Sequence, residues 1–241
     1  MDALRPPGPP TTPVTAVLLD LDGTLIDSGP TILDAFAHTL SDLGLAVGSR
    51  EELGVFIGPP LHEGFRLHAG LEGQDVDEAV RIYRSHYTRH MHKAPVYDGV
   101  PGLLDALAAA GVPTCLATSK REDLAVRLLE HKGLVSRLTA TAGADLADRG
   151  GRKAEVIGTA VRRLGEAGAD TSRVVHVGDR AHDVEGAHEA GVECVGVLWG
   201  YGDAEEMAGA DWLVDSPAQL SDLLTGLTGL PLGAHVSEAG L

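Results

Sequence analysis

One apolar segment that ends in two acids constrains this chain more than any other feature. Residues Val14–Leu19 are mainly apolar, and Asp20-Leu21-Asp22-Gly23-Thr24 follows them directly. A continuous apolar run of this length is typical of a strand that is buried on both faces of a parallel sheet. Two carboxylates at the end of such a strand are costly unless a cation or a catalytic role compensates. The alternative is a plain loop closed by an Asx turn.

The rest of the chain alternates apolar runs with helical patterns. We expect the first strand over Val14–Leu21, and further strands over Val112–Ala117, Leu138–Ala142, Arg173–Val177, Cys194–Leu198 and Trp212–Val214. Helical patterns lie between them, at Val100–Ala110, Glu122–His131, Lys153–Leu164 and Asp183–Ala190. This alternation predicts an α/β fold with a doubly wound, mainly parallel sheet and helices on both faces.

Residues 28–94 interrupt the alternation because they contain no convincing strand. They predict four helices, Thr31–Leu43, Arg50–Ile57, Leu61–Ala69 and Val76–His92. Such a block is too long for a strand–helix connection, so we expect an inserted all-helical domain. The predicted organisation is a flexible lead-in at 1–13, a core at 14–27 and 95–225, the insert at 28–94 and a C-terminal tail at 226–241. The alternative is that these helices only pack on one face of the sheet.

Composition excludes several classes of partner. The 241 residues include 35 acidic and 19 basic side chains, so the formal charge is −16. Such a surface repels nucleic acid and anionic membranes, and a phosphate site would need a local cation. No apolar stretch approaches the roughly 20 residues that span a bilayer, and the proline-rich N-terminus lacks a signal-peptide pattern. We expect a cytoplasmic monomer or homodimer with buried thiols at Cys115 and Cys194.

Polar groups follow several predicted strands. Asp20 and Asp22 follow the first, Thr118-Ser119-Lys120 the second and Gly178-Asp179 the fourth, while Lys153 begins a helix. The carboxyl ends of parallel strands share one edge, where open α/β sheets place their sites. We therefore expect these groups to converge. Each of them alone has a simpler explanation: Thr118 and Asp179 could be helix caps, and Lys153 could be a solvated lysine.

The combination suits phosphoryl transfer. Asp20 and Asp179 offer the oxygen ligands that Mg²⁺ prefers, and the ion would offset repulsion between a carboxylate nucleophile and a phosphate. Aspartate can attack through an aspartyl-phosphate intermediate, and Asp22 can protonate the leaving group and then activate water. The Thr118 hydroxyl and the backbone N–H groups after it, which are expected to open a helix, would cradle the phosphate. Lys153 would supply the local cation.

These ordered motifs resemble those of the haloacid dehalogenase (HAD) superfamily. The spacings between Asp20, Thr118, Lys153 and Asp179 are 98, 35 and 26 residues, and the resemblance covers residues 14 to about 215. The helical insert resembles the type 1 cap of that family. Three segments look like its phosphoglycolate phosphatase-like branch: Phe56–Leu61, Tyr97–Gly102 and Trp199–Gly202.

The resemblance implies a Rossmann-like core and a role for each matched position. Asp20 would be the nucleophile, and Asp22 would be the general acid/base with its backbone carbonyl on the metal. Four residues would hold Mg²⁺: Asp20, Asp22, Asp179 and Asp183. Four would bind the substrate phosphoryl group: Gly23, Thr118, Ser119 and Lys153. Among these, Thr118 and Lys153 would also take part in catalysis.

Asp22 also distinguishes reactions within the superfamily. Dehalogenases of this fold lack an acid at that position and need no Mg²⁺, and phosphonatases carry a small residue there and use a cap lysine. The resemblance therefore implies a Mg²⁺-dependent phosphatase of a small phosphorylated metabolite such as phosphoglycolate. Other readings stay open: a 5'-nucleotidase, a pyrophosphatase, a sugar-phosphate mutase or a phosphate-binding module without turnover.

Substrate choice is expected to come from the helical insert, which would close over the site and exclude water. The candidate side chains are His62, Arg66, Arg81, Arg84 and His86, although a solvated helix face explains each of them more simply. His176 lies within an apolar strand and is expected to be a core histidine with satisfied hydrogen bonds. His182 follows the Asp179 motif, but the pattern assigns it no role.

Overall fold

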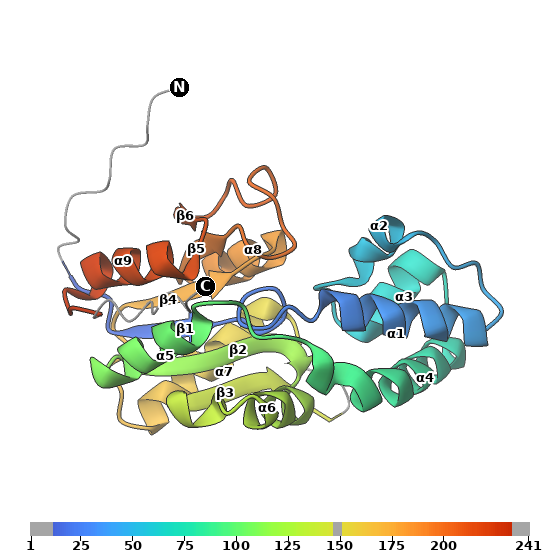
Figure 1. Ribbon diagram of the computed structural model, residues 1–241, viewed down its shortest axis with the longest axis horizontal. Coiled ribbons are helices and arrows are strands. Elements are labelled where there is room, and N and C mark those ends of the chain that lie inside the picture. Colours follow the sequence, from blue (N-terminus) through green and yellow to red (C-terminus); the bar gives the residue numbers. More distant parts are fainter. Residues whose placement is uncertain (1–11, 147–150, 233–241) are drawn as a thin grey trace, which may run out of the picture.

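The computed structural model describes residues 12–146 and 151–232. Six strands form one parallel sheet in the order β3-β2-β1-β4-β5-β6. Their bounds are β1 (Ala16–Leu19), β2 (Thr114–Arg121), β3 (Ala140–Ala144), β4 (Val174–Gly178), β5 (Glu193–Val197) and β6 (Trp212–Val214). The predicted doubly wound α/β fold is confirmed. Figure 1 shows this sheet and the helices that cover it at the left, and a separate group of helices at the right.

The strand β1 lies in the middle of the sheet, and its four residues are fully buried. Since successive side chains of a strand point to opposite faces, Val17 and Leu19 pack with one core cluster, and Ala16 and Leu18 with another. The chain runs from β1 to β2 and β3 on one side, and then returns to β4 on the other. This reversal of strand order opens a crevice beyond the carboxyl ends of β1 and β4, where ligands bind in folds of this class.

Helices cover both faces of the sheet, as predicted. The helices α5 (Val100–Ala109), α6 (Glu122–His131) and α9 (Pro217–Thr228) supply leucines to the cluster that contains Leu19. The helices α7 (Lys153–Glu166) and α8 (Ala181–Glu189) pack with the cluster that contains Leu18. The sheet is therefore buried on both sides, which explains why its strands are apolar without alternation.

The remaining helices pack around an aromatic cluster of their own beside the sheet (Figure 1). They are α1 (Gly29–Asp42), α2 (Arg50–Leu53), α3 (Leu61–Ala69) and α4 (Gln74–His90), with single 3₁₀ turns at Gly54–Phe56 and Met91–Lys93. Phe36 lies at the centre of the cluster, 4.4 Å from the Phe56 ring and 4.5 Å from the Tyr83 ring. We call α1–α4 the helical insert, and its domain boundaries near residues 28 and 94 stay a prediction.

Two elements differ from the sequence prediction. The strand β2 continues to Arg121 through an irregularity after Ala117, so no helix opens directly after Thr118, and α6 begins only at Glu122. The sequence pattern does not predict the helix α9, which includes residues 226–228 of the predicted tail. Much of the predicted lead-in and tail lies outside the described residues. Within them, no helix is both long and apolar enough to cross a bilayer.

The reactivity of the two cysteines provides a test of how tightly the sheet is packed. Cys115 and Cys194 are fully buried free thiols, as predicted, and burial raises the pKa of Cys115 to about 12. Burial raises the pKa of Cys194 as well. Because only an accessible thiolate reacts, we expect no reaction of the native protein with Ellman's reagent at pH 8. Unfolding in guanidinium should release two thiols per chain as the positive control, and rapid labelling of the native protein would contradict the packing.

Candidate active site

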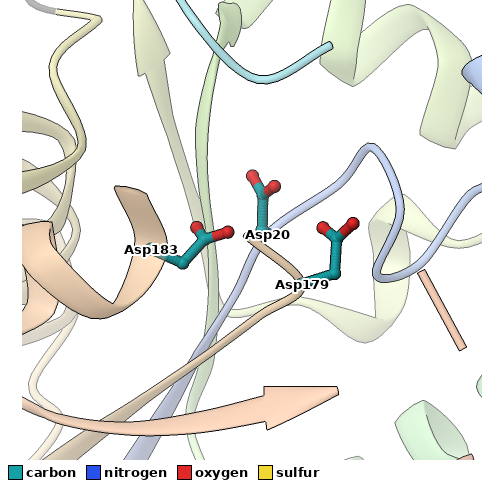
Figure 2. Close-up of side chains that lie close together, drawn as sticks. All are labelled: Asp20, Asp179 and Asp183. Carbon is teal, nitrogen blue, oxygen red and sulfur yellow. The ribbon is translucent and has the colours of Figure 1, made fainter. Parts of the chain in front are cut away.

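Three acids meet at the carboxyl ends of the central strands. Asp20 follows β1, Asp179 follows β4, and Asp183 lies in the first turn of α8. Figure 2 shows the three side chains grouped in one place. All three are buried, and one oxygen from each lies within 4.8 Å of the others. These are hard oxygen donors in the number and spacing that suit Mg²⁺, so the residues fit the metal that the sequence predicted.

Lys153 joins this group from the start of α7. Its Nζ atom lies 2.9 Å from Asp20 Oδ1 and 2.7 Å from Asp183 Oδ1, and it donates to the Ala117 carbonyl at 3.2 Å. The side chain is only 2% exposed. Burial acts to lower the pKa of Lys153, but the two carboxylates outweigh it and raise the pKa, so the group is an ammonium. A Cβ at Gly186 would lie 2.5 Å from the Lys153 Cβ, so this glycine lets α7 and α8 approach closely.

The three carboxylates together carry more negative charge than the single Lys153 ammonium neutralises. Burial raises the pKa of Asp179, and the charges of Asp183 and Asp20 raise it further. Burial likewise raises the pKa of Asp20, against the opposing effect of Lys153. Burial also acts against the charge of Asp183, but Lys153 holds its pKa well below the usual range. A divalent cation among these oxygens would offset the remaining repulsion between the carboxylates.

The loop after β5 positions Asp179. The Tyr201 N–H donates to Asp179 Oδ2 at 2.8 Å, and the Gly202 N–H donates to the Asp179 carbonyl at 3.1 Å. A Cβ at Gly200 would collide with the Asp179 side chain. On the other side, the Thr24 hydroxyl lies 3.3 Å from Asp179 Oδ1. The Asp179 carboxylate is thus fixed in direction before any metal binds.

The same loop also holds the segment that leads into the helical insert. The Tyr201 hydroxyl donates to Asp27 Oδ1 at 2.9 Å and accepts from the Gly29 N–H. The Trp199 indole N–H donates to the Thr24 carbonyl at 3.1 Å. These contacts give a structural role to Trp199–Gly202, which the sequence marked only as a resemblance.

Asp22 lies apart from the three acids and faces Lys120 instead. The Lys120 Nζ atom lies 2.6 Å and 2.9 Å from the two carboxylate oxygens, and Ser28 Oγ also donates to Asp22. The ammonium lies 4.5 Å from the centre of the Tyr87 ring on α4, in the geometry of a cation–π contact. The sequence placed Lys120 in the polar segment after the second strand but gave it no role of its own. The role of the Asp22 backbone carbonyl on the metal, which the resemblance implied, stays a prediction.

The predicted phosphate-binding residues do not all lie in the same environment. Thr118 and Ser119 line a pocket beside Asp20 and Asp22, between the sheet and the helical insert. Gly23 has a different role, since its N–H donates to the Ile26 carbonyl at 2.9 Å. A Cβ at Gly23 would collide with the Asp179 carboxylate, which explains why glycine is needed there.

Of the five candidates on the helical insert, Arg84 lines this pocket. Arg81 pairs with Glu78, His86 pairs with Asp42 and His62 lies near Asp77, all on exposed or half-exposed surfaces, and Arg66 is exposed. For the other four candidates, the simpler explanation, an exposed helix face, therefore holds. Two further residues of the pocket wall, Arg180 and His182, were not given a role by the sequence.

His176 takes part in the site indirectly. It is fully buried on β4, and its Nε2 atom lies 3.0 Å from Asp183 Oδ1. Its Nδ1 atom has no hydrogen-bond partner among the described residues. The expected core histidine is therefore only half satisfied, and its contact orients one of the three acids.

The chain belongs to the haloacid dehalogenase-like hydrolase family, whose model matches residues 17–197. It is 40% identical over 190 residues to the tyrosine-protein kinase PtkA of Mycobacterium tuberculosis, covering 78% of this chain but only 64% of that protein. It is 32% identical over 214 residues to the pyrophosphatase PpaX of Bacillus velezensis, covering 88% of this chain and 95% of PpaX. Further relatives are named 5'-nucleotidase and phosphoglycolate phosphatase.

A solved structure shows the same fold over nearly the whole chain. The crystal structure of a predicted phosphatase from Clostridium acetobutylicum superimposes with a TM-score of 0.83 at 30% identity, covering 90% of this chain and all of that one. The predicted membership of the HAD superfamily is confirmed. The roles of the individual site residues stay predictions.

Proposed function

We propose that this protein is a Mg²⁺-dependent phosphatase that hydrolyses a small phosphorylated metabolite through an aspartyl-phosphate intermediate. The observation that carries the proposal is the buried group of Asp20, Asp179 and Asp183 beside a pocket that Asp22 lines. Two of these acids, Asp20 and Asp183, pair with the Lys153 ammonium. Relatives named as phosphatases support the reaction class. The charge of −16 favours a small substrate over nucleic acid, and a cytoplasmic monomer or homodimer stays our expectation.

Asp20 and Asp179 would hold Mg²⁺, with Asp183 in support. When bound, the ion would neutralise charge on the phosphoryl oxygens and on the attacking carboxylate. Lys153 would contact the same phosphoryl group, and the Thr118 hydroxyl would donate to it. Each of these groups is preorganised by burial or by hydrogen bonds, which is what electrostatic stabilisation of a transition state requires.

The chain's own residues account for both halves of the reaction. An Asp20 oxygen forms a bond to phosphorus while the bond to the leaving oxygen breaks, and Asp22 gives that oxygen its proton. Asp22 then accepts a proton from a water molecule that attacks phosphorus, which releases phosphate and restores Asp20. Lys120 holds the Asp22 carboxylate in the pocket and so orients it for both proton transfers.

Removal of the metal tests the proposal directly. We expect hydrolysis of p-nitrophenyl phosphate in the presence of Mg²⁺, and loss of that activity to background after dialysis against EDTA, because the three acids then repel an anionic substrate. Excess Mg²⁺ should restore the rate. Full activity in metal-free protein, measured by release of p-nitrophenol, would contradict the proposal.

The similarity to PtkA favours a second candidate, transfer of a phosphoryl group to a protein tyrosine. Radiolabelled ATP separates the two functions, because a kinase would leave label on tyrosine whereas a phosphatase releases inorganic phosphate. Acid-stable label on a tyrosine, lost in the Asp20→Asn variant, would support the kinase.

A further inference from the structure

The pocket beside Asp20 is lined mainly by apolar and aromatic side chains. They come from the helical insert and from α6, and they include Ile32, Phe36, Phe56, Leu61, Tyr83 and Leu124. All of these except Leu61 are 6% exposed or less and belong to the aromatic cluster of the insert. Because such a wall gains free energy when apolar surface leaves water, it favours carbon in the group that fills the pocket.

Positive charge on this wall is neutralised within the protein. Lys120 and Arg121 lie at the end of β2, and both line the pocket. The Lys120 Nζ atom lies 2.6 Å from one carboxylate oxygen of Asp22 and 2.9 Å from the other. The Arg121 guanidinium donates to both carboxylate oxygens of Asp123, at 2.5 Å and 2.8 Å. Each ion pair is complete without a ligand, so neither cation offers a free counter-charge to a substrate.

The other two cations of the wall are engaged as well. The Arg180 Nε atom lies 2.7 Å from Glu206 Oε1, and its Nη1 atom donates to the Ile57 carbonyl at 2.7 Å. Arg84, on α4, is not free either. A second anionic group on the substrate would therefore lose its water and meet no unpaired cation among the described residues of the wall. This disfavours phosphoglycolate, the example that the resemblance implied.

The Tyr87 hydroxyl is a polar group of the wall that lacks a partner. Tyr87 is 2% exposed and lines the pocket, yet its hydroxyl has no hydrogen-bond partner among the described residues. Burial raises the pKa of Tyr87, and the charge of Asp22 raises it further, so the hydroxyl keeps its proton and can donate. Buried polar groups normally have a partner. An uncharged acceptor oxygen on the leaving group of a substrate would supply one.

We propose that this pocket takes the uncharged, mainly apolar leaving group of a small phosphomonoester, and that the Tyr87 hydroxyl donates to an oxygen of that group. The inference rests on the proposed phosphatase function and names its substrate class, the phosphate esters of small neutral alcohols. Carbon of the leaving group packs against the apolar wall, whereas a second negative charge on the substrate counts against it.

Three esters of equal size test the charge of the leaving group. Isobutyl phosphate, phosphoglycolamide and phosphoglycolate have the same number of non-hydrogen atoms, and their leaving groups are apolar, neutral polar and anionic. With Mg²⁺, the wild-type kcat/KM should be roughly 10-fold or more higher for isobutyl phosphate than for phosphoglycolate, measured by phosphate release. Glycolate is the better leaving group of the two, so leaving-group chemistry does not explain this order. Equal values or the reverse order would overturn the proposal.

The apolar contact has a test of its own in the length of the leaving group. Isobutyl phosphate should exceed methyl phosphate by roughly 10-fold or more in kcat/KM, because each buried methylene contributes roughly fourfold. The chemistry of the two alcohols is alike, so the difference reports burial of carbon in the pocket. Equal values for these two esters would contradict an apolar leaving-group site.

A charge added to the wall should change the preference. Leu61 is half-buried and lines the pocket at the start of α3. Leu61→Lys should shift the ratio of the two kcat/KM values toward phosphoglycolate by roughly 10-fold or more, the scale of a hydrogen bond to a charged group. The matched control is Leu67→Lys, because Leu67 lies on the same helix and is 65% exposed. It should keep the wild-type ratio, and equal shifts in the two variants would contradict the site.

The Tyr87→Phe variant tests the hydroxyl alone, since it keeps the ring that the Lys120 ammonium contacts. It should lower kcat/KM for phosphoglycolamide by roughly 3- to 10-fold relative to isobutyl phosphate, because only the amide offers an acceptor oxygen. An equal effect on the two esters would contradict the role assigned to this hydroxyl.

Failure of the proposed function gives a different result from failure of this inference. A wild-type protein that releases phosphate from none of these esters and none from p-nitrophenyl phosphate is not a phosphatase of this kind. One that hydrolyses p-nitrophenyl phosphate but neither isobutyl phosphate nor phosphoglycolamide overturns the leaving-group site alone. The comparison of the esters with the wild type decides the inference even where Leu61→Lys fails to fold.

Discussion

Asp20→Asn should lower the turnover of p-nitrophenyl phosphate by about 10⁴-fold or more, the scale seen when a covalent nucleophile is removed. The amide keeps the shape of the side chain but cannot attack phosphorus. Asp20 is also one of the three oxygen donors of the predicted metal site, so its loss weakens metal binding as well. Steady-state kinetics with saturating Mg²⁺ measure the effect, and mass spectrometry of the acid-quenched wild type should detect a phosphate adduct on Asp20.

The control for this variant is Asp34→Asn, which makes the same chemical change on the exposed face of α1. Its activity should match the wild type. Circular dichroism of both variants should show an intact fold, because Lys153 keeps its ion pair with Asp183 when Asp20 is neutral. An Asp20→Asn variant that turns over at the wild-type rate would rule out the covalent mechanism.

Lys153→Ala should lower the turnover by roughly 10²-fold or more, because a preorganised cation on the phosphoryl group is lost. It should also destabilise the metal-free protein by about 3–5 kcal/mol, the usual cost when one partner of a buried ion pair is removed. Two carboxylates, Asp20 and Asp183, lose their counter-charge together. Urea unfolding in EDTA measures the stability, and kinetics at a temperature where the variant is folded measure the rate.

Added Mg²⁺ should recover part of the lost stability, since the ion binds the same acids in the folded state. The matched control is Lys132→Ala, where the lysine donates to the His92 carbonyl on an exposed surface. That variant should behave as the wild type in both assays. Wild-type rates in Lys153→Ala would remove this lysine from the site.

The sheet could be predicted from sequence because its strands are short apolar runs between helical patterns. The end of β2 could not, since Thr118–Arg121 are polar, and the structure pairs Arg121 with Ala144 of β3. The helix α9 was not predicted, because Gly226 and Gly229 make its C-terminal end resemble a loop. Its leucines, Leu220, Leu224 and Leu227, nevertheless recur at helical spacing and close the core.

The part of the site that follows the ends of the strands was predictable from the sequence. Asp20, Asp179 and Asp183 come together because β1 and β4 are neighbours, and the alternation of strands and helices already implied a shared edge. The contact of Lys120 with Tyr87 was not predictable, because it depends on how the helical insert lies against the sheet. No local pattern in the sequence encodes that placement.

The loop Trp199–Gly202 limits how such a protein can diversify. Its backbone fixes Asp179, and the Tyr201 hydroxyl fixes the Gly29 end of α1. Gly200 and Gly202 approach Asp179 too closely to accept any side chain. A change of length or residue type here would disturb the acids and the attachment of the insert together. Substitutions on a helix such as α4, which lines the pocket, would change that pocket without altering this loop.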